Sequence, residues 1–214
     1  MKQTNTTKSL LLSALAVLGL ATSAFAGGDE ARSPMSGPAP GLLGQAYAGL
    51  TYSQVNLDAS PVNADRYGFE YNEPIKPGFD ALFNYDWTQS GAFAGSRTRE
   101  HELAATLRAF STNQSWGLPY VEGGIGYDWV RFAGARDSSF VWIAGAGVEF
   151  QATAELTVTP FVRYERAHGF ADNNDFNYGV KANYWFSPKC AFTAAISRND
   201  RQDTAGKVGI NIRY

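Results

Sequence analysis

The chain has little cysteine and no surplus of positive charge. Cys190 is the only cysteine among 214 residues, so no disulfide can form within the chain. A lipoprotein anchor is also disfavoured, because Cys190 lies far from the expected signal cleavage site near the amino terminus. Lysine and arginine number 18 against 20 aspartates and glutamates, which gives no case for nucleic acid as a partner.

Long hydrophobic runs are absent beyond the amino terminus. Lys2 and Lys8 precede the apolar run Leu10–Leu20, and an A-x-A pattern ends at Ala26. This arrangement predicts a secretory signal peptide over residues 1–26 that is cleaved after Ala26. The alternative, an uncleaved membrane helix, is disfavoured because the apolar run is short. No later stretch approaches the roughly 18 apolar residues of a membrane helix, so any membrane crossing must use strands.

The rest of the chain divides in two by composition. Residues 27–43 are rich in Gly, Pro, Ser and charge, and we expect a flexible periplasmic leader there. Residues 44–214 repeat a single pattern, in which about ten residues of period-2 alternation are followed by turn residues. Ten such segments are present: Gly44–Val55, Asp65–Asn72, Phe79–Trp87, Glu102–Ala109, Val121–Trp129, Phe140–Phe150, Leu156–Glu165, Phe176–Phe186, Cys190–Ser197 and Lys207–Tyr214.

This alternation predicts an all-β fold. In the segment Phe79–Trp87 every second residue is aromatic or Ala, and the residues between are Asp80, Leu82, Asn84 and Asp86. A helix would distribute these residues around its circumference, whereas a strand sorts them onto two faces. We expect a closed antiparallel up-and-down transmembrane β-barrel of about ten strands, with eight as an alternative. Pro160 fits this pattern poorly, because proline lacks the backbone N–H that a strand residue donates to the neighbouring strand.

A water-soluble β-sandwich would also show alternation, but aromatic residues favour the barrel. They gather at both ends of the proposed lipid-facing side, as in the girdles of membrane barrels. One rim would hold Trp87, Tyr127, Trp129, Phe140, Trp142 and Tyr164, and the other Phe79, Phe150, Tyr184, Phe186 and Phe192.

The links between segments alternate in kind. Compact turns are expected around Glu73–Pro77, Ser111–Leu118, Ala152–Glu155 and Ser187–Lys189, in the periplasm. More polar or glycine-rich links are expected outside the cell, around Asn56–Ala64, Gln89–Arg99, Phe132–Ser138, Gly169–Asp175 and Asn199–Ala205.

With the apolar face assigned to lipid, the lumen is predicted to hold an ionic network of eight acids and six bases. Its members are Arg66, Glu70, Asp80, Asp86, Glu102, Arg108, Glu122, Asp128, Glu149, Arg163, Glu165, Lys181, Lys207 and Arg213. Charges of opposite sign could fill a small barrel with ion pairs, or they could line a narrow porin-like channel with slight cation preference. The near balance of charge favours the filled lumen.

Several phrases carry a resemblance to a known group: GFDALFNYDW, YVEGGIGYDWVRF, FVWIAGAGVEF and the final VGINIRY. Together with the signal peptide they resemble the small outer-membrane β-barrel superfamily of Gram-negative bacteria, which includes the outer-membrane protein A barrel and opacity-type proteins. The resemblance implies localisation in the cell outer membrane and contact with its lipid. It also implies an assembly signal, formed by Val208, Ile210, Ile212 and Tyr214 and read by the barrel-assembly machinery.

Catalytic chemistry has little support in the sequence. His101 and His168 are the only histidines, and each lies near a proposed extracellular rim, where omptin-type barrel proteases use acid and His residues. A barrel hydrolase is therefore the third hypothesis, and we expect no enzyme. The spacing of His and acidic residues does not fit a metal site, no phosphate loop is present, and no cofactor is expected. The preferred function is a non-enzymatic barrel serving envelope integrity or surface interaction, with an extracellular ligand that the sequence does not identify.

Overall fold

The computed structural model describes residues 41–58, 62–92, 96–112, 117–168 and 173–214. Within these ranges the chain forms ten strands: β1 (Tyr47–Asn56), β2 (Asn63–Lys76), β3 (Phe79–Ser90), β4 (Arg99–Phe110), β5 (Leu118–Phe132), β6 (Ala135–Gln151), β7 (Leu156–His168), β8 (Asn173–Trp185), β9 (Cys190–Asn199) and β10 (Thr204–Arg213). The expected signal peptide and the leader up to residue 40 lie outside the described ranges. No helix in these ranges is long and apolar enough to cross a membrane.

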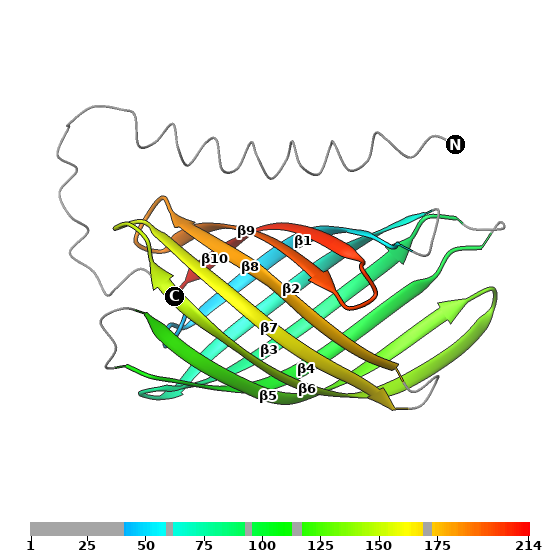
Figure 1. Ribbon diagram of the computed structural model, residues 1–214, viewed down its shortest axis with the longest axis horizontal. Coiled ribbons are helices and arrows are strands. Elements are labelled where there is room, and N and C mark those ends of the chain that lie inside the picture. Colours follow the sequence, from blue (N-terminus) through cyan, green and yellow to red (C-terminus); the bar gives the residue numbers. More distant parts are fainter. Residues whose placement is uncertain (1–40, 59–61, 93–95, 113–116, 169–172) are drawn as a thin grey trace. The chain divides into compact units, whose positions relative to one another are not determined.

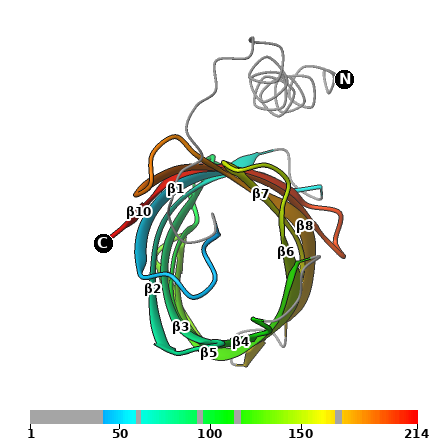
Figure 2. The same cartoon turned by 90° about the vertical axis from the view of Figure 1, so that its left-hand side faces the viewer.

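The strands close into an antiparallel barrel. Each strand pairs with its neighbours in sequence, and β1 pairs with β10 to complete the ring (Figures 1 and 2). The predicted all-β barrel of about ten strands is confirmed, and neither the eight-stranded alternative nor the sandwich applies. Closure gives every strand a hydrogen-bonded neighbour on both sides, as a membrane interior requires.

The period-2 alternation sorts each strand between the outer wall and the lumen. On β3, Phe79, Phe83 and Tyr85 are 41%, 46% and 39% exposed on the outer wall, while Asp80 and Leu82 are almost fully buried in the lumen. The other strands repeat this arrangement, so the outer wall is apolar and most of the lumen is polar. A closed barrel with an apolar outer wall is suited to lipid.

The last strand follows the same rule. Val208, Ile210, Ile212 and Tyr214 are all exposed on the outer wall. Tyr214 stacks on Tyr71 of β2 with 6.0 Å between ring centroids. The role of these residues as an assembly signal stays a prediction.

Two of the expected connections are different in the structure. The polar link expected around Phe132–Ser138 is wrong, because β5 and β6 continue through it and only Ala133 and Gly134 join them. Both residues have positive φ, of 49° and 85°, which is the backbone of a tight hairpin turn. The turn expected around Glu73–Pro77 is shorter, because β2 continues to Lys76 and only residues 77 and 78 join it to β3. The link between β4 and β5 covers residues 111–117, close to the expected bounds, and 113–116 of it lie outside the described ranges.

The first strand begins later than its alternation predicts. The segment expected from Gly44 starts as a strand only at Tyr47, because Gly44 adopts a φ of +72° and turns the chain before it away from the wall. Glycine reaches this conformation without the steric cost that a side chain would add. The residues before β1 enter the lumen instead.

Pro160 lies within β7 and faces the outer wall. Towards β8 it pairs in register with Val180, but towards β6 the paired positions pass from Phe161 directly to Val158. The missing N–H of proline accounts for an interrupted ladder on that side.

Candidate functional site in the barrel lumen

The chain from Gly41 to Ala46, called here the N-terminal segment, lies inside the barrel. Figure 2 shows the blue start of the described chain turning into the ring of strands. Leu42 is 1% exposed and Leu43 is 7% exposed, so both are enclosed. The end of the barrel that holds this segment and Tyr214 is called the inner end, and the opposite end is the outer end. Gly41, Leu42 and Leu43, the last residues of the expected leader, therefore lie within the barrel.

Polar groups from the wall hold the backbone of the N-terminal segment. The backbone N–H of Leu42 donates to Glu149 of β6 over 3.1 Å, and that of Gly44 donates to Asp80 of β3 over 2.9 Å. Asn72 of β2 donates its amide N–H to the carbonyl of Gln45 over 2.8 Å, and Arg213 of β10 donates to the carbonyl of Gly41. Because β6 lies five strands from β1 around the ring, the segment reaches the opposite wall.

An apolar cluster receives the side chain of Leu42. It consists of Leu42 with Tyr47, Leu82, Trp185 and Ala191, from β1, β3, β8 and β9. The guanidinium of Arg213 lies 3.6 Å from the centroid of the Trp185 ring, in cation–π geometry. Sequence reasoning missed this cluster, although large apolar residues on otherwise polar strand faces, such as Leu82 and Trp185, were a usable signal.

The most enclosed ion pair joins neighbouring strands beside this cluster. Arg108 of β4 lies 2.9 Å from Glu122 of β5, and the side chain of each is 7% exposed. The Arg108 guanidinium also lies 4.8 Å from the centroid of the Tyr120 ring. A Cβ atom at Gly145 or Gly147 of β6 would lie within 3 Å of Glu122 or Tyr120. The glycines of β6 thus make room for the ion pair and the ring.

A second group of charges crosses the lumen. Arg163 of β7 lies 2.6 Å from Glu165 on its own strand and 3.8 Å from Glu102 of β4. Two strands, β5 and β6, separate β4 from β7 around the wall. Arg163 therefore links distant parts of the lumen.

The structure brings the other predicted network residues together only in part. All fourteen are buried or half-buried. Glu70 accepts a hydrogen bond from Tyr47, and Arg66 donates to Thr88 over 3.1 Å. For Asp86, Asp128, Lys181 and Lys207, no ion pair occurs within the ranges that the structure describes. Asp80, Glu149 and Arg213 bind the N-terminal segment in place of an opposite charge.

Uncharged polar side chains form a hydrogen-bonded ladder across β7, β8, β9 and β10. Asn183 donates to Thr157 over 3.3 Å and accepts from Thr193 over 2.7 Å, and Asn211 donates to Thr193 in turn. All four side chains are at most 4% exposed. This ladder was not part of the predicted network, because only charged residues had been assigned to it.

The outer half of the lumen is acidic. Asp86, Glu102 and Asp128 lie directly opposite one another on β3, β4 and β5. Carboxylates in such positions repel each other. Arg66 interacts electrostatically with Asp86 and Glu102. No group of three or more His, Cys, Asp or Glu in the described ranges is arranged to hold a metal ion.

The two histidines lie on the outer wall, on separate strands. His101 of β4 is hydrogen-bonded through Nδ1 to the Tyr85 hydroxyl over 2.8 Å, and it lies opposite Trp129. His168 ends β7, opposite Phe140 of β6. Two strands lie between β4 and β7, so the histidines do not share a site.

Solved structures share this architecture. The NanC porin superimposes with a TM-score of 0.51 at 10% identity, over 78% of this chain and all of that chain. The fold is that of a small outer-membrane β-barrel. The β domain of the Bordetella autotransporter BrkA gives 0.49 at 10% identity, over 79% of this chain and 98% of that chain. The translocator domain of NalP from Neisseria meningitidis gives 0.47 at 11% identity, over 79% and 88%.

No family model matches the chain, and neither does any curated protein. The barrel fold and the apolar outer wall together give its localisation, the outer membrane of a Gram-negative bacterium. The fold alone does not specify the function of this outer-membrane barrel, because one such fold serves many functions. The function therefore depends on its own residues.

Proposed function

We propose that this outer-membrane barrel is non-enzymatic, that its lumen is closed to solutes, and that it serves envelope integrity or surface interaction. One observation carries the proposal: Leu42 is enclosed in the lumen at 1% exposure. Wall groups on β2, β3, β6 and β10 hold the backbone around it. A segment bound to opposite walls obstructs the path along the barrel.

The charges beyond the N-terminal segment support the same function. Arg108, directly opposite the Asp80 that holds Gly44, pairs with Glu122, and Arg163 pairs with Glu102 and Glu165 further towards the outer end. Buried pairs of this kind are costly to separate, because each separated charge would remain in a poorly solvated space. A solute would have to displace them.

A narrow porin-like channel is the second candidate. The observation that favours it is the row of carboxylates Asp86, Glu102 and Asp128, which would attract cations into the outer half of the lumen. Passage would require the N-terminal segment to leave the inner end.

Conductance of the purified full-length protein in a planar lipid bilayer tests the proposal. We expect no sustained unitary currents from the wild-type protein in potassium chloride, with a known porin as the positive control. Insertion is verified independently by protection of the strands from protease. Sustained ohmic currents from inserted wild-type protein would overturn the closed lumen and support the channel.

A further inference from the structure

Three arginines form a continuous row on the outer wall at the outer end. Arg99 of β4 lies directly opposite Arg131 of β5, and Arg131 lies directly opposite Arg136 of β6. All three are exposed. Like charges in directly opposite positions destabilise a sheet unless an anion offsets them.

Within the described ranges the row has no carboxylate partner. No carboxylate in the described ranges forms an ion pair with Arg99, Arg131 or Arg136. Asp137 lines the same hollow as Arg131 and Arg136, but it forms no ion pair with them, and one of its oxygens accepts the backbone N–H of Ser138 over 2.7 Å. The row therefore has donors left for an external group.

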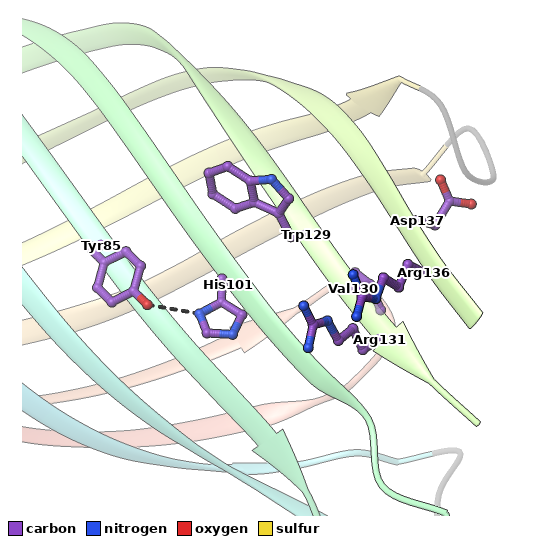
Figure 3. A pocket seen from close by; sticks show the side chains of 7 residues that line it. All are labelled: Tyr85, His101, Trp129, Val130, Arg131, Arg136 and Asp137. Atoms are coloured by element: carbon purple, nitrogen blue, oxygen red, sulfur yellow. Dashed lines mark hydrogen bonds between the residues drawn. The ribbon is translucent and has the colours of Figure 1, made fainter. Parts of the chain in front are cut away.

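The surroundings of the row are those of a lipid interface. Trp129, two residues before Arg131 on the same face, is 43% exposed, and Phe140 and Trp142 continue the aromatic rim on β6. Figure 3 shows Arg131 and Arg136 near each other, beside Trp129 and the hydrogen-bonded pair Tyr85 and His101. These residues line a hollow of about 430 Å³. Aromatic rims of this kind lie at the level of lipid headgroups.

We propose that Arg99, Arg131 and Arg136 bind the phosphate of a phosphorylated lipid headgroup in the outer leaflet. Guanidinium groups match phosphate oxygens with paired hydrogen bonds, and an anion among three cations relieves their mutual repulsion. A membrane lipid is the favoured source because the row faces lipid and continues the aromatic rim. The proposal goes beyond the closed lumen, and it holds whether or not the lumen conducts.

Lipid retention in nanodiscs tests the proposal. The full-length protein is reconstituted in phosphatidylcholine with a small fraction of lipid A, and bound lipid is counted by native mass spectrometry. Wild-type protein is expected to retain lipid A. The variant R131Q/R136Q is expected to retain about tenfold less, since charge-assisted bonds to phosphate are lost.

Arg198→Gln is the matched control. Arg198 is an exposed arginine of β9, on the far side of the ring from β4, and it donates to Gln202 over 3.2 Å. Its loss should leave lipid A retention unchanged. Equal retention by R131Q/R136Q, or equal loss in R198Q, would overturn the proposal.

Two further arms identify the source of the phosphate. Lipid A lacking its phosphates should be retained no better by wild-type protein than by R131Q/R136Q, and the opposite result would refute phosphate recognition. Millimolar inorganic phosphate should leave retention largely intact, whereas full displacement would assign the row to soluble anions and overturn the lipid. Unchanged circular dichroism of each variant shows that the barrel has folded.

Discussion

At the scale of single residues, the cost of burying charge determines which partners the lumen side chains contact. Arg108 and Glu122 are each 7% exposed at the side chain, so neither has enough water to stabilise it alone. Asp80 and Glu149 avoid this cost differently, by accepting backbone N–H groups of Gly44 and Leu42. A carboxylate in this lumen is satisfied by whichever donor the fold brings to it.

Removal of one member of the Arg108–Glu122 ion pair should be strongly destabilising. Arg108→Met leaves the Glu122 carboxylate buried without its partner, and we expect the free energy of unfolding to fall by about 3–5 kcal/mol. Urea unfolding in lipid vesicles, followed by tryptophan fluorescence, measures it. The double variant R108M/E122Q should recover much of the loss. Lys207→Met is the control, and an equal loss there would show that the pair has no special role.

At the scale of elements, the N-terminal segment and the β5–β6 hairpin are the features that the pattern of strands did not reveal. Alternation predicts strands but gives no sign of what enters the lumen. The sequence did not predict the full length of this hairpin, because its strands extend beyond the apolar part of the wall. There β6 continues through the polar residues Arg136 and Asp137.

Burial of Leu42 can be tested by thiol labelling. In a Cys190→Ala background, Leu42→Cys should react slowly with a membrane-impermeant maleimide because the side chain is enclosed among Tyr47, Leu82 and Trp185. Ala154→Cys, in the exposed turn between β6 and β7, should react rapidly as the control. Equal rates in folded protein would show that the N-terminal segment leaves the lumen readily.

The hairpin turn offers a stabilising change. Ala133 has a φ of 49°, where a side chain costs energy that glycine does not incur, so Ala133→Gly should stabilise the hairpin by about 0.5–1 kcal/mol. Hydrogen exchange of the amides in β5 and β6 should slow accordingly. Ala152→Gly, at an exposed position without positive φ, should give no such gain. Faster exchange in A133G would contradict the backbone assigned to this turn.

At the scale of the whole molecule, the inner end and the outer half of the lumen differ in character. The inner end holds the N-terminal segment and an apolar cluster, while Asp86, Glu102 and Asp128 face the lumen beyond it. An opened barrel should therefore select cations.

Expulsion of the N-terminal segment should reveal this selectivity. Leu42→Glu places a charge in the apolar cluster, and we expect the segment to leave and currents to appear that favour potassium over chloride. The reversal potential in a salt gradient measures the preference. Asp86→Asn together with Asp128→Asn in the same background should reduce it. Anion preference in L42E would contradict the acidic outer half.

The sequence by itself determined the barrel and its apolar outer wall. A period of two is visible in one strand at a time, so Phe79, Phe83 and Tyr85 could be assigned to one face before any partner strand was known. The same rule predicted that the fourteen charged residues face inward, and their role as one network stays a prediction.

Only the tertiary structure decided what those residues contact. Arg163 and Glu102 lie on strands that are not neighbours, and Leu42 reaches Glu149 across 107 positions of sequence. Ring closure and strand register bring such pairs together, and no local pattern encodes them. The alternation therefore determines which side chains face inward, whereas the geometry of the closed ring determines that a segment of the chain itself, held by Asp80, Glu149 and Arg213, occupies the space they surround.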